Sequence, residues 1–165
     1  MKTIVITGTP GTGKSFVAKK LAAKLKFHYI DVNKFIDKKR LSEGFDKKRN
    51  SRIIDVNKLG HALINEIHHL EKQKKKKKGI IIDSHLSHHL PEHHVDLCIV
   101  TKCSLKVLSK RLKGKKFHKE KIEENLQAEI FNICHEEAKM LHHKILEIDT
   151  TKGFNIKDLA KKLGG

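Results

Sequence analysis

One motif strongly constrains the fold of this chain, a glycine-rich segment over residues 8–15 that fits the pattern G-x-x-x-x-G-K-[ST] of a phosphate-binding loop. Glycines let the backbone curl so that successive N–H groups point into one concavity, which favours an anion together with the N-terminus of the following helix. Lys14 is placed to reach the β- and γ-phosphates of a nucleotide, and the Ser15 hydroxyl to coordinate Mg²⁺. We therefore expect ATP and Mg²⁺ as cofactors. The residues expected to bind them are Gly11, Thr12, Gly13, Lys14, Ser15 and Phe16.

The segments on either side of this loop fit the same interpretation. Residues 2–7 form a β-branched run typical of a buried strand, and residues 16–25 have the apolar spacing of an amphipathic helix. These neighbours argue against the alternative, a glycine-rich turn with a solvated lysine. We expect a single α/β P-loop domain over residues 1–165, with a five-stranded parallel sheet and helices on both faces. The further strand-like runs lie at 27–31, 80–83, 95–100 and 144–149.

Composition bears on location and partners. The chain has 165 residues, and Lys and Arg outnumber Asp and Glu by 36 to 19, which gives a net charge of +17. A field of that sign concentrates polyanions, so contact with RNA is one interpretation, and a lysine-rich surface that serves solubility or heat stability is the other. No apolar run approaches the ~18 residues of a membrane span, and the three cysteines have no paired metal spacing. We expect a cytoplasmic protein with reduced thiols and no membrane contact.

Polar segments interrupt the alternation of strands and helices. Residues 33–54 are rich in charge, which predicts an excursion on the rim of the domain rather than a core layer. The basic turn at 113–118 is placed to close over a nucleotide as a short lid, and for both segments the alternative is a plain solvated turn. The lysine-rich run at 72–78 is either an RNA-contacting tip or a solvated helix end. One long helix is expected near 119–142.

A carboxylate and several histidines follow the strand-like run at 80–83. Asp83 ends that run, where P-loop proteins place a carboxylate on the Mg²⁺ side of the site, so Ser15 and Asp83 are the expected metal-binding pair. His85 is placed to orient or deprotonate water near the γ-phosphate. The stretch 85–94 holds enough histidines to suggest a transition-metal site, but their spacing fixes no ligand set, so a polar loop is the default expectation.

Together these segments resemble a nucleoside monophosphate kinase, with an acceptor region at 33–54 and a lid near 113–118. More narrowly, the sequence resembles the adenylate kinase isoenzyme 6 family, also called CINAP, over nearly its whole length. The Asp83-Ser84-His85 triplet and the segment 124–131 are the most telling parts of the resemblance. The motifs that carry it lie at residues 7–15, 29–32, 79–85, 124–131 and 136–138.

The resemblance implies phosphoryl transfer from ATP to AMP, or to another nucleoside monophosphate, together with ATPase activity. It also implies a role in maturing the small ribosomal subunit, with a small-subunit ribosomal protein and rRNA as partners. The family's lid often carries an arginine, whereas this chain has Lys115 followed by Lys116. Lysine keeps the charge but loses the bidentate fork, and Arg111 is close enough in sequence to compensate. The acceptor-site arginine is one of Arg40, Arg49 and Arg52.

These considerations give one set of expected catalytic residues and three candidate functions. The chain is a monomeric adenylate kinase, an ATP-switched assembly factor whose kinase activity is incidental, or another small-molecule P-loop kinase, for example one acting on shikimate or a pyrimidine nucleotide. If the chain is an adenylate kinase, an oxygen of the AMP phosphate attacks the γ-phosphorus of ATP, so no side-chain nucleophile is needed. The expected catalytic residues are Lys14, Asp83, His85, Arg111 and Lys115.

Overall fold

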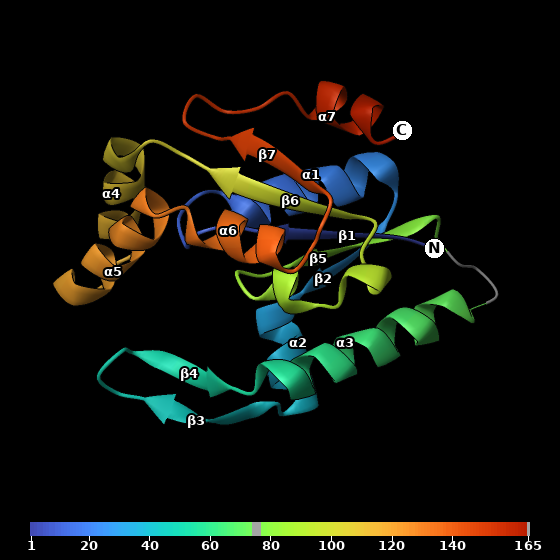
Figure 1. Cartoon of the computed structure of the whole chain (residues 1–165), viewed down its shortest axis with the longest axis horizontal. Helices are drawn as coiled ribbons and strands as arrows, with labels where there is room; N and C mark the ends of the chain where they lie inside the picture. The colour runs from blue at the N-terminus through green and yellow to red at the C-terminus, as the bar shows by residue number, and fades with distance from the viewer. Residues whose placement is uncertain (74–76, 165) are drawn as a thin grey trace.

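Five parallel strands form the centre of the computed structural model, in the order β2-β5-β1-β6-β7 (Figure 1). The structure describes residues 1–73 and 77–164. Because β1 is the middle strand, the glycine-rich loop that follows it opens at the centre of the sheet's carboxyl edge, where open α/β sheets bind ligands. The expected five-stranded parallel sheet is confirmed. Its strands are β1 (Lys2–Thr7), β2 (His28–Asp31), β5 (Gly79–Asp83), β6 (Leu97–Lys102) and β7 (Ile145–Asp149).

Helices cover both faces of this sheet, as predicted. Along β1, Ile4 and Ile6 pack against α1 and α7, whereas Val5 packs against α2, α3 and α6 on the other face. This alternation follows from the two-residue period of a strand, and burial on both faces explains the nearly continuous apolar runs. Among the described residues, no helix has the length and apolar character needed to cross a membrane. The helices are α1 (Lys14–Leu25), α2 (Val32–Lys39), α3 (Val56–Glu71), α4 (Leu105–Gly114), α5 (Lys119–Ile130), α6 (Ile133–Met140) and α7 (Ile156–Lys162).

The longest of these helices, α3, begins at an aspartate cap. The Asp55 side chain accepts hydrogen bonds from the backbone N–H groups of Asn57 and Lys58, which satisfies two donors at the start of the helix. The helix ends at Glu71, just before the lysine-rich run. That run's predicted roles fall partly on residues 74–76, which lie outside the described residues. The core face of α3 is formed by Leu59, Leu63, Ile67 and Leu70, all buried.

The segment 33–54 has two parts in different environments. Its first part lies in α2, whose Phe35 and Ile36 are buried in the core, so the prediction that the segment contributes no core layer is wrong there. Together with Val32 these residues follow the i, i+3, i+4 spacing of a helix face, a pattern too short to stand out among charged neighbours. The second part is an antiparallel hairpin, β3 (Ser42–Asp46) with β4 (Ser51–Ile54), which lies apart from the main sheet (Figure 1).

The prediction of one long helix near 119–142 is also wrong. The chain forms α5 and α6 instead, and between them Asn132 adopts a left-handed conformation with φ of 54°. Asparagine tolerates that conformation better than most residues, so it ends one helix and redirects the chain into the next. As a result, Ile130 and Ile133 are 57% and 40% exposed and do not extend a single core face.

Candidate active site

The loop between β1 and α1 has a backbone that its glycines make possible. Gly8, Gly11 and Gly13 have φ values of 140°, 97° and 91°, a region that other residues rarely adopt. At Gly11 there is also no space for a side chain, because a Cβ atom would lie 2.8 Å from Cδ1 of Leu108 on α4. Residues 13–16 bring the N-terminus of α1 to the wall of a cleft, where the backbone N–H groups at the start of the helix favour an anion.

Lys14 is held inside this cleft. Its Nζ atom donates a hydrogen bond of 3.2 Å to the carbonyl oxygen of Thr9. Burial lowers the pKa of the Lys14 ammonium to about 8, although Cys134 and Asp83 partly oppose the effect. An ammonium whose charged form is disfavoured by burial gains most from an anionic ligand, so the electrostatics of the site favour a phosphate group beside Lys14.

The cleft has a volume of about 1080 Å³, which slightly exceeds the range of ~300–1,000 Å³ usual for small-molecule sites. One wall is the glycine-rich loop with the start of α1. The others come from the end of β5, from the turn after α4 with α5 and α6, and from the β3–β4 hairpin. The expected site residues that line it together are Gly11, Gly13, Lys14, Ser15, Phe16, Asp83, His85, Arg111 and Lys115.

Thr12 is the one expected binding residue that does not line the cleft. It is fully buried beneath the loop, and its hydroxyl lies 2.7 Å from both the Thr9 carbonyl oxygen and Oγ1 of Thr101. The Thr12 side chain therefore stabilises the loop from below, and the expectation that Thr12 contacts the nucleotide directly is not supported by its position.

Asp83 lies at the carboxyl end of β5 and is only 4% exposed. The hydroxyl of Tyr29, on the neighbouring strand β2, donates a hydrogen bond of 2.9 Å to Oδ2 of Asp83. Burial and the Asp83 charge both raise the pKa of Tyr29, so its hydroxyl remains a donor. Carboxylate and hydroxyl oxygens are the ligands that Mg²⁺ prefers, and Asp83 and Ser15 line one cleft, so the donor set fits this ion.

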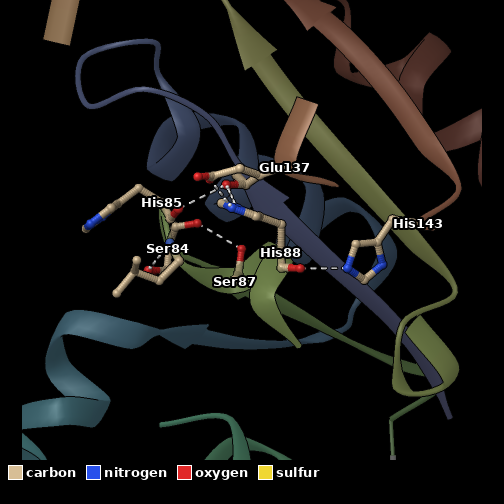
Figure 2. Close-up of polar contacts among 8 residues, drawn as sticks. Ser84, His85, Ser87, His88, Glu137 and His143 are labelled. Carbon is tan, nitrogen blue, oxygen red and sulfur yellow. Dashed lines mark hydrogen bonds and ion pairs between the residues drawn. The ribbon is translucent and has the colours of Figure 1, made fainter. Parts of the chain in front are cut away.

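His85 follows Asp83 by two residues and also lines the cleft. Burial of the ring within the cleft and, second to it, the nearby Lys14 charge lower the pKa of His85 to about 4. The imidazole is therefore neutral at pH 7. Figure 2 shows that its side chain points away from His88 and Glu137. A neutral imidazole can accept a proton or orient a water molecule.

The two expected cations of the lid region have different surroundings. The Arg111 guanidinium donates hydrogen bonds to the Gly11 carbonyl oxygen at 3.3 Å and to both oxygens of Thr150 at 3.0 Å. The Thr150 hydroxyl in turn donates to the Thr12 carbonyl oxygen at 2.6 Å. Arg111 is thus fixed against the loop, whereas Lys115 is exposed in the turn after α4.

The three candidate acceptor arginines lie in different environments. Arg49, in the turn between β3 and β4, lines the cleft. Arg52 is paired with Asp37 on α2 at 2.6 Å, and Arg40 ends α2 as an exposed cap. Lys121 of α5 donates a hydrogen bond of 2.8 Å to the Asn50 carbonyl oxygen and so joins the lid side of the cleft to the hairpin.

Sequence reasoning missed several of these residues. Tyr29, Lys121 and Thr150 act through partners 39 to 71 residues away in the chain, so no local spacing marks them. Tyr29 is the only tyrosine and lies in the segment 29–32, which is one of the motifs that carry the family resemblance, and that was the signal available for it.

Comparison with known proteins places the sequence among adenylate kinase relatives. The sequence model of an AAA-domain family matches residues 4–132. A putative adenylate kinase of Pyrococcus furiosus is 36% identical over 148 residues, which cover 90% of this chain and 74% of that protein. The adenylate kinase isoenzyme 6 homolog of Caenorhabditis elegans is 34% identical over 82% of this chain and 71% of its own length. The homolog FAP7 of Saccharomyces cerevisiae is 36% identical over 82% of this chain and 65% of its own length.

Solved structures share the fold at low sequence identity. Shikimate kinase from Acinetobacter baumannii superposes with a TM-score of 0.62 at 16% identity and covers 99% of this chain and 90% of its own. Deoxyadenosine kinase from M. mycoides gives a TM-score of 0.56 at 14% identity, over 98% and 97% of the two chains. At such identity the likeness concerns the α/β architecture alone.

Proposed function

Because the chain belongs to the adenylate kinase isoenzyme 6 family of P-loop kinases, we propose that it transfers the γ-phosphoryl group of ATP to AMP. The observation that carries the proposal is the cleft itself. Lys14 and the N-terminus of α1 line one part of it, and Arg49 of the hairpin lines another. Positive charge on two different segments of one cleft suits two phosphate-bearing substrates.

In the proposed arrangement ATP binds on the glycine-rich loop. The backbone N–H groups of residues 13–15 and the Lys14 ammonium contact its β- and γ-phosphates. Ser15 and Asp83 would hold Mg²⁺, which when bound neutralises part of the phosphate charge. Tyr29 keeps the Asp83 carboxylate oriented through its hydrogen bond. These groups fix the position of the γ-phosphoryl group and stabilise its equatorial oxygens.

AMP would lie beside the hairpin, with its phosphate near Arg49. An oxygen of that phosphate attacks the γ-phosphorus of ATP, the bond to the β-γ bridging oxygen breaks, and two ADP molecules result. The attacking oxygen is already anionic, so the step needs no side-chain nucleophile. Lys115 and Lys121, which both line the cleft, supply further positive charge near the transferring group. Water in place of AMP would give ATP hydrolysis, with His85 orienting that water.

The test is a panel of acceptors supplied with γ-labelled ATP and Mg²⁺. The panel contains AMP, CMP, UMP, shikimate and deoxyadenosine, and the labelled product is identified for each. We expect label in ADP when AMP is present, and no transfer by Lys14→Ala, whose circular dichroism should match that of the wild type. Transfer to shikimate or deoxyadenosine in preference to AMP would assign the chain to another class of kinase.

A second candidate function is an ATP-switched assembly factor for the small ribosomal subunit, acting as a cytoplasmic monomer. It is supported by the net charge of +17 and by two neighbouring apolar residues, Ile130 and Phe131, which are 57% and 67% exposed. The charge suits rRNA, and the apolar residues suit a protein partner. The test is the ATP hydrolysis rate with and without small-subunit rRNA and ribosomal proteins. A rate that none of these partners changes, with rapid phosphorylation of AMP, would exclude the switch.

A further inference from the structure

Three potential metal ligands meet where the short 3₁₀ helix η1 (Ser87–His89) contacts α6. They are His88 and His89 of η1 and Glu137 of α6, and one ligand atom from each lies within 4.8 Å of the others. We call these three residues the His88 cluster. The closest pair is Nε2 of His88 and Oε2 of Glu137, at 2.9 Å. Figure 2 shows Glu137 and His88 pointing toward each other.

The position of His88 is fixed by further hydrogen bonds. Its Nδ1 atom lies 2.7 Å from Oγ1 of Thr7, the last residue of β1, and that hydroxyl also contacts the His85 carbonyl oxygen at 3.3 Å. The second nitrogen of a metal-binding histidine is usually held in this way, which fixes the orientation of the ring. The His143 imidazole holds the His88 backbone by donating a hydrogen bond of 2.7 Å to its carbonyl oxygen.

One residue of the His88 cluster is buried and the other two are partly exposed, an arrangement that suits a bound ion. His88 is 1% exposed, whereas His89 and Glu137 are partly buried and line the cleft. A metal held by the three side chains would therefore keep one position open toward the cleft, where water can bind. Three protein ligands with one open position is the arrangement of zinc sites that retain an exchangeable ligand.

The chemistry of the ligands selects a class of metal. Two imidazoles and one carboxylate suit Zn²⁺ and neighbouring first-row divalent ions better than Mg²⁺ or Ca²⁺, which prefer oxygen ligands alone. Zinc bonds of ~2.0–2.2 Å place neighbouring ligand atoms about 3.3–3.6 Å apart in a tetrahedral site. The 4.8 Å limit of the cluster is thus close enough for side-chain rotations to complete the site.

We propose that the His88 cluster is a binding site for Zn²⁺ or a similar first-row divalent ion, which links η1 to α6 at the edge of the cleft. The proposal rests on the cluster's geometry and does not depend on the proposed phosphoryl transfer. Since the ion binds two segments 49 residues apart, it also stabilises the folded state.

The experiment uses the full chain after treatment with a chelator and without nucleotide. It is titrated with Zn²⁺ by calorimetry and with Co²⁺ by visible absorption, which reports tetrahedral coordination. We expect one equivalent to bind and the melting temperature to rise with Zn²⁺. His89→Ala and Glu137→Gln should each weaken binding by at least the ~10–100-fold that loss of a supporting residue costs a metal site.

A matched control is available on the same loop. His93 and His94 form a second adjacent pair whose ring centroids are 4.3 Å apart, equal to the separation of His88 and His89. The double variant His93→Ala, His94→Ala should bind Zn²⁺ like the wild type. The proposal is overturned if the wild type binds no equivalent, if His89→Ala and Glu137→Gln bind as well as the wild type, or if only the control variant loses binding. His89→Ala keeps the partly buried His88–Glu137 hydrogen bond, so its result does not depend on that bond's role in folding.

Discussion

The Tyr29 hydroxyl donates a hydrogen bond of 2.9 Å to Oδ2 of Asp83, between the neighbouring parallel strands β2 and β5. This bond occupies one oxygen of a carboxylate that is only 4% exposed. Asp83 also lines the cleft, together with Ser15. The single tyrosine of the chain thus orients the carboxylate that we expect to serve the metal ion.

Replacing Tyr29 with phenylalanine tests this relationship. Tyr29→Phe keeps the ring and removes the donor, so the fold should lose no more than the ~1–3 kcal/mol of a hydrogen bond to a charged group. We expect phosphoryl transfer to fall by roughly 10–100-fold and the Mg²⁺ concentration for half-maximal activity to rise. Activity measured over a range of Mg²⁺ concentrations separates this positioning role from a structural one, since lost packing alone would leave the Mg²⁺ dependence unchanged.

Lys14 should favour function at the expense of stability. Burial lowers its pKa to about 8, from 10.5 in the unfolded chain, so the unfolded state binds more protons between these values. Stability without nucleotide should therefore rise as pH increases from about 8 to 10.5 and be lowest below pH 8. Lys14→Met should abolish transfer, raise the free energy of unfolding at pH 7 by roughly 1–3 kcal/mol, and remove this pH dependence. Urea unfolding at several pH values measures the free energy of unfolding of both proteins. A Lys14→Met variant that is less stable than the wild type at pH 7 would contradict the account.

Arg49 is the candidate acceptor-site arginine that lines the cleft. Arg49→Ala should raise the KM for AMP about 10-fold or more, the equivalent of one charge-assisted contact, and change the KM for ATP little. Lys48→Ala removes the same charge from the adjacent position of the same turn, outside the cleft lining, and should leave both constants unchanged. Equal effects of the two variants would indicate that the positive charge of the hairpin attracts AMP non-specifically, without a direct contact from Arg49.

Gly79 is required for steric reasons. It is buried at the start of β5, and a Cβ atom there would lie 2.3 Å from the Phe27 ring. Gly79→Ala should destabilise the fold by about 1–3 kcal/mol or more, because the ring has to move within a packed core. Gly60→Ala, in the middle of α3 with no atom near the added Cβ, should instead be neutral or stabilising. Thermal unfolding of both variants checks the difference.

The sequence was most informative where local pattern determines structure. The β-branched runs around Ile4 and Ile81 predicted the strands of a parallel sheet because both faces of those strands are buried. The break at Asn132 was missed because one left-handed residue between helical stretches leaves the apolar spacing almost unchanged. The apolar residues of α2, among them Phe35 and Ile36, did not stand out because charged and polar residues surround them.

Site residues that depend on tertiary neighbours could not be predicted. Tyr29 meets Asp83 only because β2 pairs with β5, and the strand order is not encoded in any local spacing. The same holds for Glu137, which reaches a histidine 49 residues earlier in the chain. The glycine-rich loop itself was readable because its residues are contiguous.

The fate of the γ-phosphoryl group tests the central claim most directly. In a single reaction with γ-labelled ATP, Mg²⁺ and AMP, the label is partitioned between ADP and inorganic phosphate. If the cleft holds both nucleotides as proposed, most of the label should appear in ADP, and Lys14→Ala should give neither product. Label that appears only as inorganic phosphate, at a rate that AMP does not change, would contradict phosphoryl transfer to AMP.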